Sequence, residues 1–268
     1  MKRSSRASIA IALLAVLSAN VPTAAVAGPA WQPAGGWTIR HDDHCVAELR
    51  FAHKSQQLQF AIEPGPTSPS NFAYVVTDGD GEFGWTKAEI AIGTKWKAGQ
   101  TIHVMPSKLP HHIAYKWGLS DEQLGALETA GRIQVVSEDL RVDLSLPDLA
   151  AARAQLRACD SALLAGWGFS PEQQERLAHF PTIVKAAIKD SDYPASAYNR
   201  GSIGDVNGYL TVGADGKASN CHVLDSSGWP ELDSQSCQLL LQRPQYKPAT
   251  DKAGKPMTAP YYFQWVWH

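Results

Sequence analysis

The sequence predicts an α+β protein of two small domains, and three observations support this fold class. The chain has 268 residues, of which 44% are hydrophobic, so it has enough apolar side chains for proper cores and is not disordered. Its first half alternates short apolar and polar segments with glycine- and proline-rich turns, which is typical of antiparallel strands. A helical pattern then ends in Ala165-Gly166-Trp167-Gly168-Phe169, and this interruption places the domain boundary near Trp167.

The first domain, residues 28–168, is expected to be mainly β and to close with a helix at its C-terminal end. Ser120-Asp121-Glu122-Gln123 forms a capping box that starts a short helix, and Gly131 ends it. Leu149, Leu156 and Leu163 recur at helical spacing and predict the closing helix. Strands are expected at residues 37–40, 45–51, 58–62, 72–77, 87–92, 101–105, 133–136 and 140–144.

The second domain, residues 169–268, is expected to be a small antiparallel sheet packed on helices. Ser170-Pro171-Glu172-Gln173 forms another capping box, with proline at the first helical position. Asp215-Gly216 is the strongest hairpin signal in the chain. The expected helices run from Ser170 to Pro181, from Thr182 to Lys189, and from Leu232, with Asp233 as N-cap, to Pro244; the expected strands are residues 209–212, 221–224 and 261–267.

Residues 1–27 are expected to be a signal peptide. A basic start precedes an apolar stretch over residues 7–17, and Ala25-Val26-Ala27 matches the A-x-A cleavage pattern. Cleavage after Ala27 would leave an exported, periplasmic protein without a stable membrane span, because no later apolar run reaches membrane length. The alternative is an uncleaved segment that anchors the chain in the inner membrane.

The four cysteines are expected to form two disulfides, because an even number in an exported chain suggests pairing. Four cysteines allow three pairings, and the context favours one. Cys45 lies on the inward face of a strand and Cys159 on the apolar face of a helix, whereas Cys221 and Cys237 lie close together late in the chain. We therefore expect the pairs Cys45–Cys159 and Cys221–Cys237. A zinc site would need C-x-x-C clusters, which the sequence lacks.

Composition and motifs exclude several functions. The formal net charge is -2, whereas a nucleic-acid binder normally shows a strong basic excess. The sequence has no phosphate-binding or dinucleotide-binding glycine motif. It also lacks the G-x-S-x-G elbow of hydrolases, because Gly201-Ser202-Ile203-Gly204 is one residue out of register. We therefore expect a protein that is not an enzyme and holds no cofactor.

Three polar motifs could ligate a metal but are expected to be solvated turns or loops. In His41-Asp42-Asp43-His44, the two histidines would point to opposite faces of a strand, and the adjacent His111 and His112 rarely share an ion. Asp78-Gly79-Asp80-Gly81-Glu82 resembles the start of a calcium loop but lacks the distal glutamate. The sequence therefore predicts no metal site.

The C-terminal third contains a series of short motifs in a fixed order. They are Tyr193-Pro194 with Ala197, Gly204 and Val206, Asp215-Gly216, Ser226-Ser227-Gly228, Leu232-Asp233, Tyr246-Lys247-Pro248-Ala249 and Gly254-Lys255-Pro256. By the order and spacing of these motifs, residues 175–268 resemble the TonB C-terminal domain family. Cys221 and Cys237 are additional to the family pattern, and the first domain is similar only to uncharacterised exported proteobacterial modules.

The resemblance implies a periplasmic domain that pairs an open sheet edge with an extended segment of an outer-membrane receptor, which is β-strand addition. This chain has a cleavable leader and a folded domain where a full transducer has a membrane anchor and a proline-rich spacer. We therefore expect a non-enzymatic periplasmic binding or adaptor protein whose partner is an envelope or outer-membrane protein. The alternatives are a membrane-anchored energy transducer for outer-membrane transport, and an exported enzyme with its site in the first domain.

The final strand is the candidate binding edge, and two faces alternate along it. The aromatic face is expected to pack as core under a helix, and it consists of Tyr261, Phe263, Trp265 and Trp267. The opposite face is expected to point outward beside a partner strand, and it consists of Tyr262, Gln264 and Val266.

Overall fold

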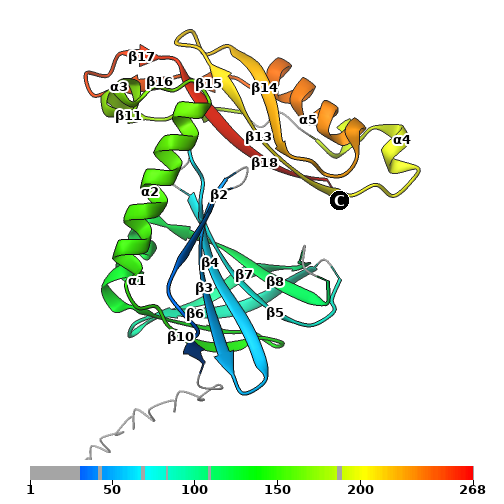
Figure 1. Ribbon diagram of the computed structural model, residues 1–268. Helices are drawn as coiled ribbons and strands as arrows, with labels where there is room; N and C mark the ends of the chain where they lie inside the picture. The colour runs from blue at the N-terminus through cyan, green and yellow to red at the C-terminus, as the bar shows by residue number, and fades with distance from the viewer. Residues whose placement is uncertain are drawn as a thin grey trace, which may run out of the picture.

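The computed structural model describes residues 31–267, except residues 42–43, 68–69, 83, 108–109 and 186–188. The predicted signal peptide, residues 1–27, and the pair Asp42-Asp43 lie outside these residues, so those predictions stay untested. The described chain folds into a mainly-β N-terminal unit and an α+β C-terminal unit, and helix α2 (Leu149–Gly166) runs from one to the other (Figure 1). No helix in this described part is both long enough and apolar enough to cross a membrane.

The N-terminal unit is built on one antiparallel sheet of ten strands. They are β1 (Gln32–Pro33), β2 (Thr38–His41), β3 (Cys45–His53), β4 (Gln56–Pro64), β5 (Ser70–Asp78), β6 (Gly84–Ile92), β7 (Lys95–Pro106), β8 (His112–Ser120), β9 (Arg132–Val136) and β10 (Arg141–Ser145). Their order is β1-β3-β4-β5-β8-β7-β6-β9-β10, and β2 pairs with β3. The sheet curls until its two end strands, β1 and β10, come into contact.

Alternation along these strands places the large apolar side chains inside the curled sheet. Phe51, Phe60 and Trp117 are buried in one core, which also receives Leu124 and Leu127 from the helix α1 (Asp121–Ala130). The capping box before this helix and the left-handed glycine after it are both present, as predicted. Helix α2 packs against β2 and β3, and its apolar side chains join the same core.

Strand β8 was not among the strands that the sequence predicts. Its inward side chains Tyr115, Trp117 and Leu119 are buried, as in the neighbouring strands. However, the outward Ala114 and Lys116 are buried as well. The strand therefore does not show the apolar–polar alternation of a half-exposed strand, because both of its faces are covered.

The C-terminal unit contains one main sheet and two small ones. Its elements are α3 (Pro171–Arg176), β11 (Leu177–His179), β12 (Thr182–Ile183), a 3-10 helix (Asp190–Asp192), α4 (Ala195–Tyr198), β13 (Gly204–Val212), β14 (Ala218–Asp225), α5 (Pro230–Gln242), β15 (Tyr246–Lys247), β16 (Ala249–Asp251), β17 (Pro256–Met257) and β18 (Ala259–Trp267). The main sheet has the order β14-β13-β18, and the small sheets are β11-β16-β17 and β12-β15. Helix α5 packs against β13 and β14.

Two helix predictions in this unit were wrong. The helix from Ser170 ends at Arg176, and Thr182 begins a short strand, because β11 and β12 pair with β16 and β15 much later in the chain. Helix α5 begins earlier than predicted, with Trp229 at its N-cap position. Asp233 lies in its first turn, where the carboxylate accepts a hydrogen bond from the Ser227 amide at 3.0 Å. Local sequence patterns do not reveal strand pairing between distant segments. They also do not reveal that Asp233 accepts a hydrogen bond from a residue before the helix and is not itself the N-cap.

Both predicted disulfides are present. The Cys45–Cys159 bond joins β3 to α2 across 114 residues of sequence, and the Cys221–Cys237 bond joins β14 to α5 across 16 residues. Each bond therefore ties a helix to the sheet that it covers.

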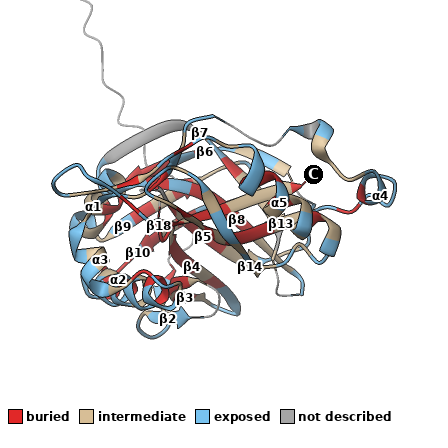
Figure 2. Ribbon diagram, turned by 90° about the horizontal axis from the view of Figure 1, so that it is seen from above, coloured by how far each residue is buried: buried red, intermediate tan, exposed pale blue. Residues whose placement is uncertain are grey.

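The two units have separate apolar cores, and a third cluster joins them. This junction cluster consists of Leu164 near the end of α2, Phe169, and Ala249, Met257 and Ala259 from β16, β17 and β18. Seen from above, buried residues follow the strands in the middle of the molecule, whereas α2 and α3 carry many exposed residues (Figure 2). The end of α2 is thus the hydrophobic link between the units.

Removing either disulfide should destabilise the protein. Cys221→Ala with Cys237→Ala should lower the free energy of unfolding by about 3 kcal/mol, because the bond closes a short loop in the unfolded chain. Cys45→Ala with Cys159→Ala should lower it by about 5 kcal/mol, because the loop is longer. Urea denaturation measures both changes. Non-reducing peptide mapping is the control, and a peptide linking Cys45 to Cys221 or Cys237 would contradict the pairing.

Asp160 on α2 should make stability depend on pH. Its Oδ1 is buried without a hydrogen-bond partner among the described residues, and burial raises its pKa from 3.8 to about 7. The folded state therefore holds a proton that the unfolded chain has already released, so stability should fall as the pH rises from about 4 to 7 and then level off. Asp160→Asn should remove this decline and be more stable than wild type at pH 8.

Thermal unfolding from pH 4 to 8 tests this prediction. Glu138→Gln, which neutralises an exposed carboxylate in the same unit, is the control and should keep the wild-type pH profile. If Asp160→Asn retains the full decline, Asp160 is not its source.

Candidate functional site: the last strand and the surface it faces

Strand β18 forms one edge of the main C-terminal sheet, and all nine of its residues pair with β13. Its aromatic face packs toward α5, where Phe263 and Trp267 are buried in one core with Leu239. The Trp267 indole Nε1 also donates a hydrogen bond to Ser236 Oγ at 2.9 Å. The prediction that this aromatic stripe is core is confirmed.

The free edge of β18 carries backbone groups that β13 does not use. The Tyr262 amide points to this edge, because it donates a hydrogen bond to Thr67 Oγ1 at 2.7 Å. In an antiparallel ladder the direction of the amides alternates along the strand. Gln264 and Val266 therefore present their amides to the same edge. Thr67 lies between β4 and β5, so the N-terminal unit occupies one of these three positions.

The second face of β18 points toward the N-terminal unit and not toward solvent. Tyr262 is only 7% exposed, and the Gln264 Oε1 accepts a hydrogen bond from Lys116 Nζ at 2.9 Å. Val266 shares this face and is half-buried. The prediction that Tyr262, Gln264 and Val266 point outward was therefore wrong. A polar residue such as Gln264 on an alternating strand suggests a face exposed to solvent. Here Gln264 instead contacts Lys116 of the N-terminal unit.

Lys116 lies at the centre of this contact, and sequence reasoning missed it. It is 7% exposed, and its Nζ lies 4.2 Å from the centre of the Phe72 ring and 5.0 Å from that of Tyr74. Burial lowers the pKa of Lys116, whereas the carboxylates of Glu63 and Asp205 oppose that change. A lysine inside the apolar run of β8 was the available signal, since lysine is rarely buried without partners.

Glu63 and Tyr74 complete the polar cluster on the N-terminal side. Glu63 is 5% exposed, and its carboxylate accepts a hydrogen bond from the Tyr74 hydroxyl. Burial raises the pKa of Tyr74, and the adjacent Glu63 carboxylate raises it further. Tyr74 therefore stays a neutral donor at physiological pH. The cluster thus contains the buried carboxylate of Glu63, whose negative charge favours the charged form of the buried Lys116.

Trp167 holds the two units together at the end of α2. Its ring stacks on Tyr209 of β13, with centroids 4.3 Å apart and planes 10° from parallel. Tyr262 lies nearly parallel to the same ring, with centroids 6.4 Å apart. The Tyr262 hydroxyl and the Asn207 Oδ1 are buried without hydrogen-bond partners among the described residues. Buried polar atoms are usually paired, so these two oxygens leave the hydrogen bonding of the interface incomplete.

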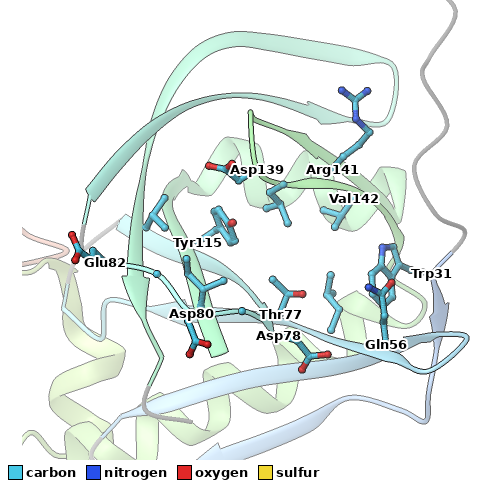
Figure 3. Close-up of a pocket in the computed structure, with 16 residues that line it drawn as sticks. Trp31, Gln56, Thr77, Asp78, Asp80, Glu82, Tyr115, Asp139, Arg141 and Val142 are labelled. Atoms are coloured by element: carbon cyan, nitrogen blue, oxygen red, sulfur yellow. The ribbon is translucent and has the colours of Figure 1, made fainter. Parts of the chain in front are cut away.

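The N-terminal unit also contains a cavity of about 630 Å³ between its strands. Trp31 and Tyr115 lie on opposite sides of it, and Asp139 and Arg141 come from the loop and strand that follow β9 (Figure 3). The predicted turn after β5 contributes Asp78, Asp80 and Glu82 to its lining. The carboxylates of the suspected calcium loop therefore border a cavity.

The other polar motifs do not form a metal site among the described residues. His111 Nδ1 lies 3.0 Å from Asp80 Oδ1, and His112 Nε2 lies 3.3 Å from Asp78 Oδ1, as separate exposed pairs. In the described part of the chain, three ligand-type groups converge at His41, Cys45 and Cys159. The two cysteines are joined in a disulfide and have no thiolate to offer.

Comparison with known proteins finds a similarity for most of the C-terminal unit. A search of curated proteins finds no match to this chain. Residues 189–268 match the family described as Gram-negative bacterial TonB protein C-terminal, which confirms the resemblance seen in the sequence. The matched residues include β13, β14, α5 and β18 and therefore the candidate edge. The N-terminal unit and residues 169–188 lie outside the part of the chain that matches this family.

Proposed function

We propose that this chain is a non-enzymatic periplasmic binding or adaptor protein, and that its C-terminal domain recognises an extended segment of an envelope protein by β-strand addition. The observation that carries the proposal is the position of β18 at the sheet edge, where it presents outward backbone amides within a TonB C-terminal domain. An exposed strand edge is a ready template for another strand. Backbone hydrogen bonds would supply affinity, and neighbouring side chains would supply specificity.

In this proposal the boundary near Trp167 separates a binding domain, residues 169–268, from a covering domain, residues 28–168. The covering domain contacts the second face of β18 through the hydrogen bond from Lys116 to Gln264. Its Thr67 hydroxyl also accepts a hydrogen bond from the Tyr262 amide at the strand edge. A partner strand would find the amides of Gln264 and Val266 first. Pairing along the whole edge would require Thr67 to move away from β18.

The alanine and proline variants of Val266 separate backbone recognition from side-chain recognition. Val266→Pro removes the outward amide and should weaken partner binding about tenfold or more. Val266→Ala keeps the amide and should bind almost like wild type. Val266 is a better test position than Gln264, because changing Gln264 also leaves Lys116 without its hydrogen bond.

The partner is first captured from envelope extract, and its binding segment is then titrated as a synthetic peptide by calorimetry. Circular dichroism must show that the proline variant is folded, because a strand proline can unfold a small sheet. A folded Val266→Pro protein that binds the peptide normally would exclude β18 as the binding edge.

Thr67→Val should strengthen binding of the same peptide. The substitution removes the hydroxyl that accepts from the Tyr262 amide, and thereby frees that amide for the partner strand. One hydrogen bond contributes about 1 kcal/mol, so the Kd should fall about fivefold. Thr86→Val on β6 makes the same chemical change away from β18 and should have no effect. An unchanged Kd for Thr67→Val would mean that Thr67 and the peptide do not compete.

A further inference from the structure

Strand β18 crosses the outer face of the N-terminal sheet, so a strand added at its edge would also touch that sheet. The Tyr262 amide meets Thr67 in the turn between β4 and β5, and two residues later the Gln264 side chain meets Lys116 on β8. In Figure 1 the C-terminal unit lies over the N-terminal strands. Strand β18 therefore passes from the β4–β5 turn toward β8.

The free edge of β18 faces the end of the N-terminal sheet where β8 terminates. Thr67, the acceptor for the edge amide of Tyr262, lies in the turn that leads into Ser70 at the start of β5. Ser70 pairs with Ser120, which is the last residue of β8. The edge therefore looks toward the C-terminal residues of β8.

Gly118 and Phe72 form the part of the outer face that lies next to this edge. Gly118 comes two residues after Lys116 on β8, so it lies on the same face, and it pairs with Phe72 of β5. Two residues of a strand span about 6.8 Å, and neighbouring strands of a sheet lie about 4.8 Å apart. Because Gln264 contacts Lys116, a strand added beside β18 would lie close to Gly118.

The conformation and packing of the chain itself do not require a glycine at position 118. Its φ is not positive, and a Cβ there would have nothing within 4 Å among the described residues. Gly118 is exposed, although Trp117 and Leu119 on either side of it are buried. Glycine weakens a strand, and inside a strand it often marks a place where a ligand or another backbone approaches closely.

An aromatic side chain suits the space above Gly118. Facing sheets pack about 10 Å apart, and side chains from both sheets normally fill that distance. Gly118 contributes no side chain, so a partner residue must be large to reach the N-terminal sheet. The ring of Phe72 is half-buried and can pack against an aromatic ring. The Lys116 ammonium group, 4.2 Å from the centre of that ring, disfavours a second cation there.

We propose that the partner segment added at β18 carries an aromatic residue that lies over Gly118 and packs against Phe72, and that this contact selects the partner. The inference rests on the proposed strand addition. It adds a specificity determinant in the N-terminal unit, outside the residues that match the TonB family.

Peptide selection on the full chain tests the proposal. Random nine-residue peptides displayed on phage are selected for binding to the wild-type chain and depleted on Val266→Pro, which lacks an edge amide. The tightest surviving peptide is synthesised as the aromatic probe, and a second probe carries alanine in place of its aromatic residue. We expect the alanine probe to bind wild type about tenfold more weakly in calorimetry.

Gly118→Leu should reverse this preference. The new side chain occupies the space above β8, so the aromatic probe should bind about tenfold or more weakly than to wild type, whereas the alanine probe should bind no worse. Gly118→Ala adds only a methyl group and should weaken the aromatic probe about threefold. Gly36→Leu, at another exposed glycine with open space around its Cβ position, is the control and should bind both probes like wild type.

The outcomes separate this inference from strand addition itself. Circular dichroism must show that Gly118→Leu is folded; if it is not, Gly118→Ala decides. Unchanged binding of the aromatic probe, or surviving peptides without a shared aromatic position, would overturn the contact with Gly118 and leave addition at β18 intact. If no selected peptide depends on the Val266 amide, strand addition at β18 fails, and this inference fails with it.

Discussion

The burial of Lys116 between two sheets constrains how the two units fit together. An ammonium group with 7% exposure needs partners on every side, and these come from both units. Gln264 of the C-terminal unit accepts a hydrogen bond from Lys116, and the rings of Phe72 and Tyr74 on the N-terminal sheet lie next to the same ammonium group. Separating the units would break this arrangement and expose Tyr262. The relative position of the units is therefore set by a charge as well as by apolar packing.

This constraint explains why the C-terminal sheet is covered on both faces. Its aromatic face packs toward α5, and the opposite face lies over β4, β5 and β8. Trp167 adds a stacked contact to Tyr209, and Leu164 joins the apolar cluster at the end of α2. The Cys45–Cys159 bond ties α2 to β3, so the helix that carries these contacts is itself held to the N-terminal sheet. The edge of β18, in contrast, is touched at one known amide only within the described residues, that of Tyr262.

Much of the fold could be predicted from local patterns, because those patterns act over short distances. The capping boxes at Ser120 and Ser170, the Asp215-Gly216 hairpin and the final strand all appear in the structure. The pairing of the cysteines followed from the side of each element on which they lie. Strand β8 and the short strands after Arg176 were missed, because their form depends on neighbours far along the chain.

The candidate site was only partly predictable for the same reason. The aromatic core face of β18 followed from alternation along one strand, whereas its position at a sheet edge was an expectation from the family resemblance. The role of Lys116 and Thr67 did not, because a single strand does not reveal which surface it faces. The cavity combines Trp31, Asp80 and Asp139, which no local motif connects.

The contact between Thr67 and Tyr262 spans 195 positions of sequence, and this has a consequence for the order of folding. Chains emerge from the ribosome with the N-terminal end first. The outer surface of β4, β5 and β8, with Lys116 and Phe72, is therefore complete long before β18 can cover it. During that interval this charged aromatic surface is open to water and to chaperones. Addition of the last strand then completes the C-terminal sheet and at the same time covers this surface of the N-terminal unit.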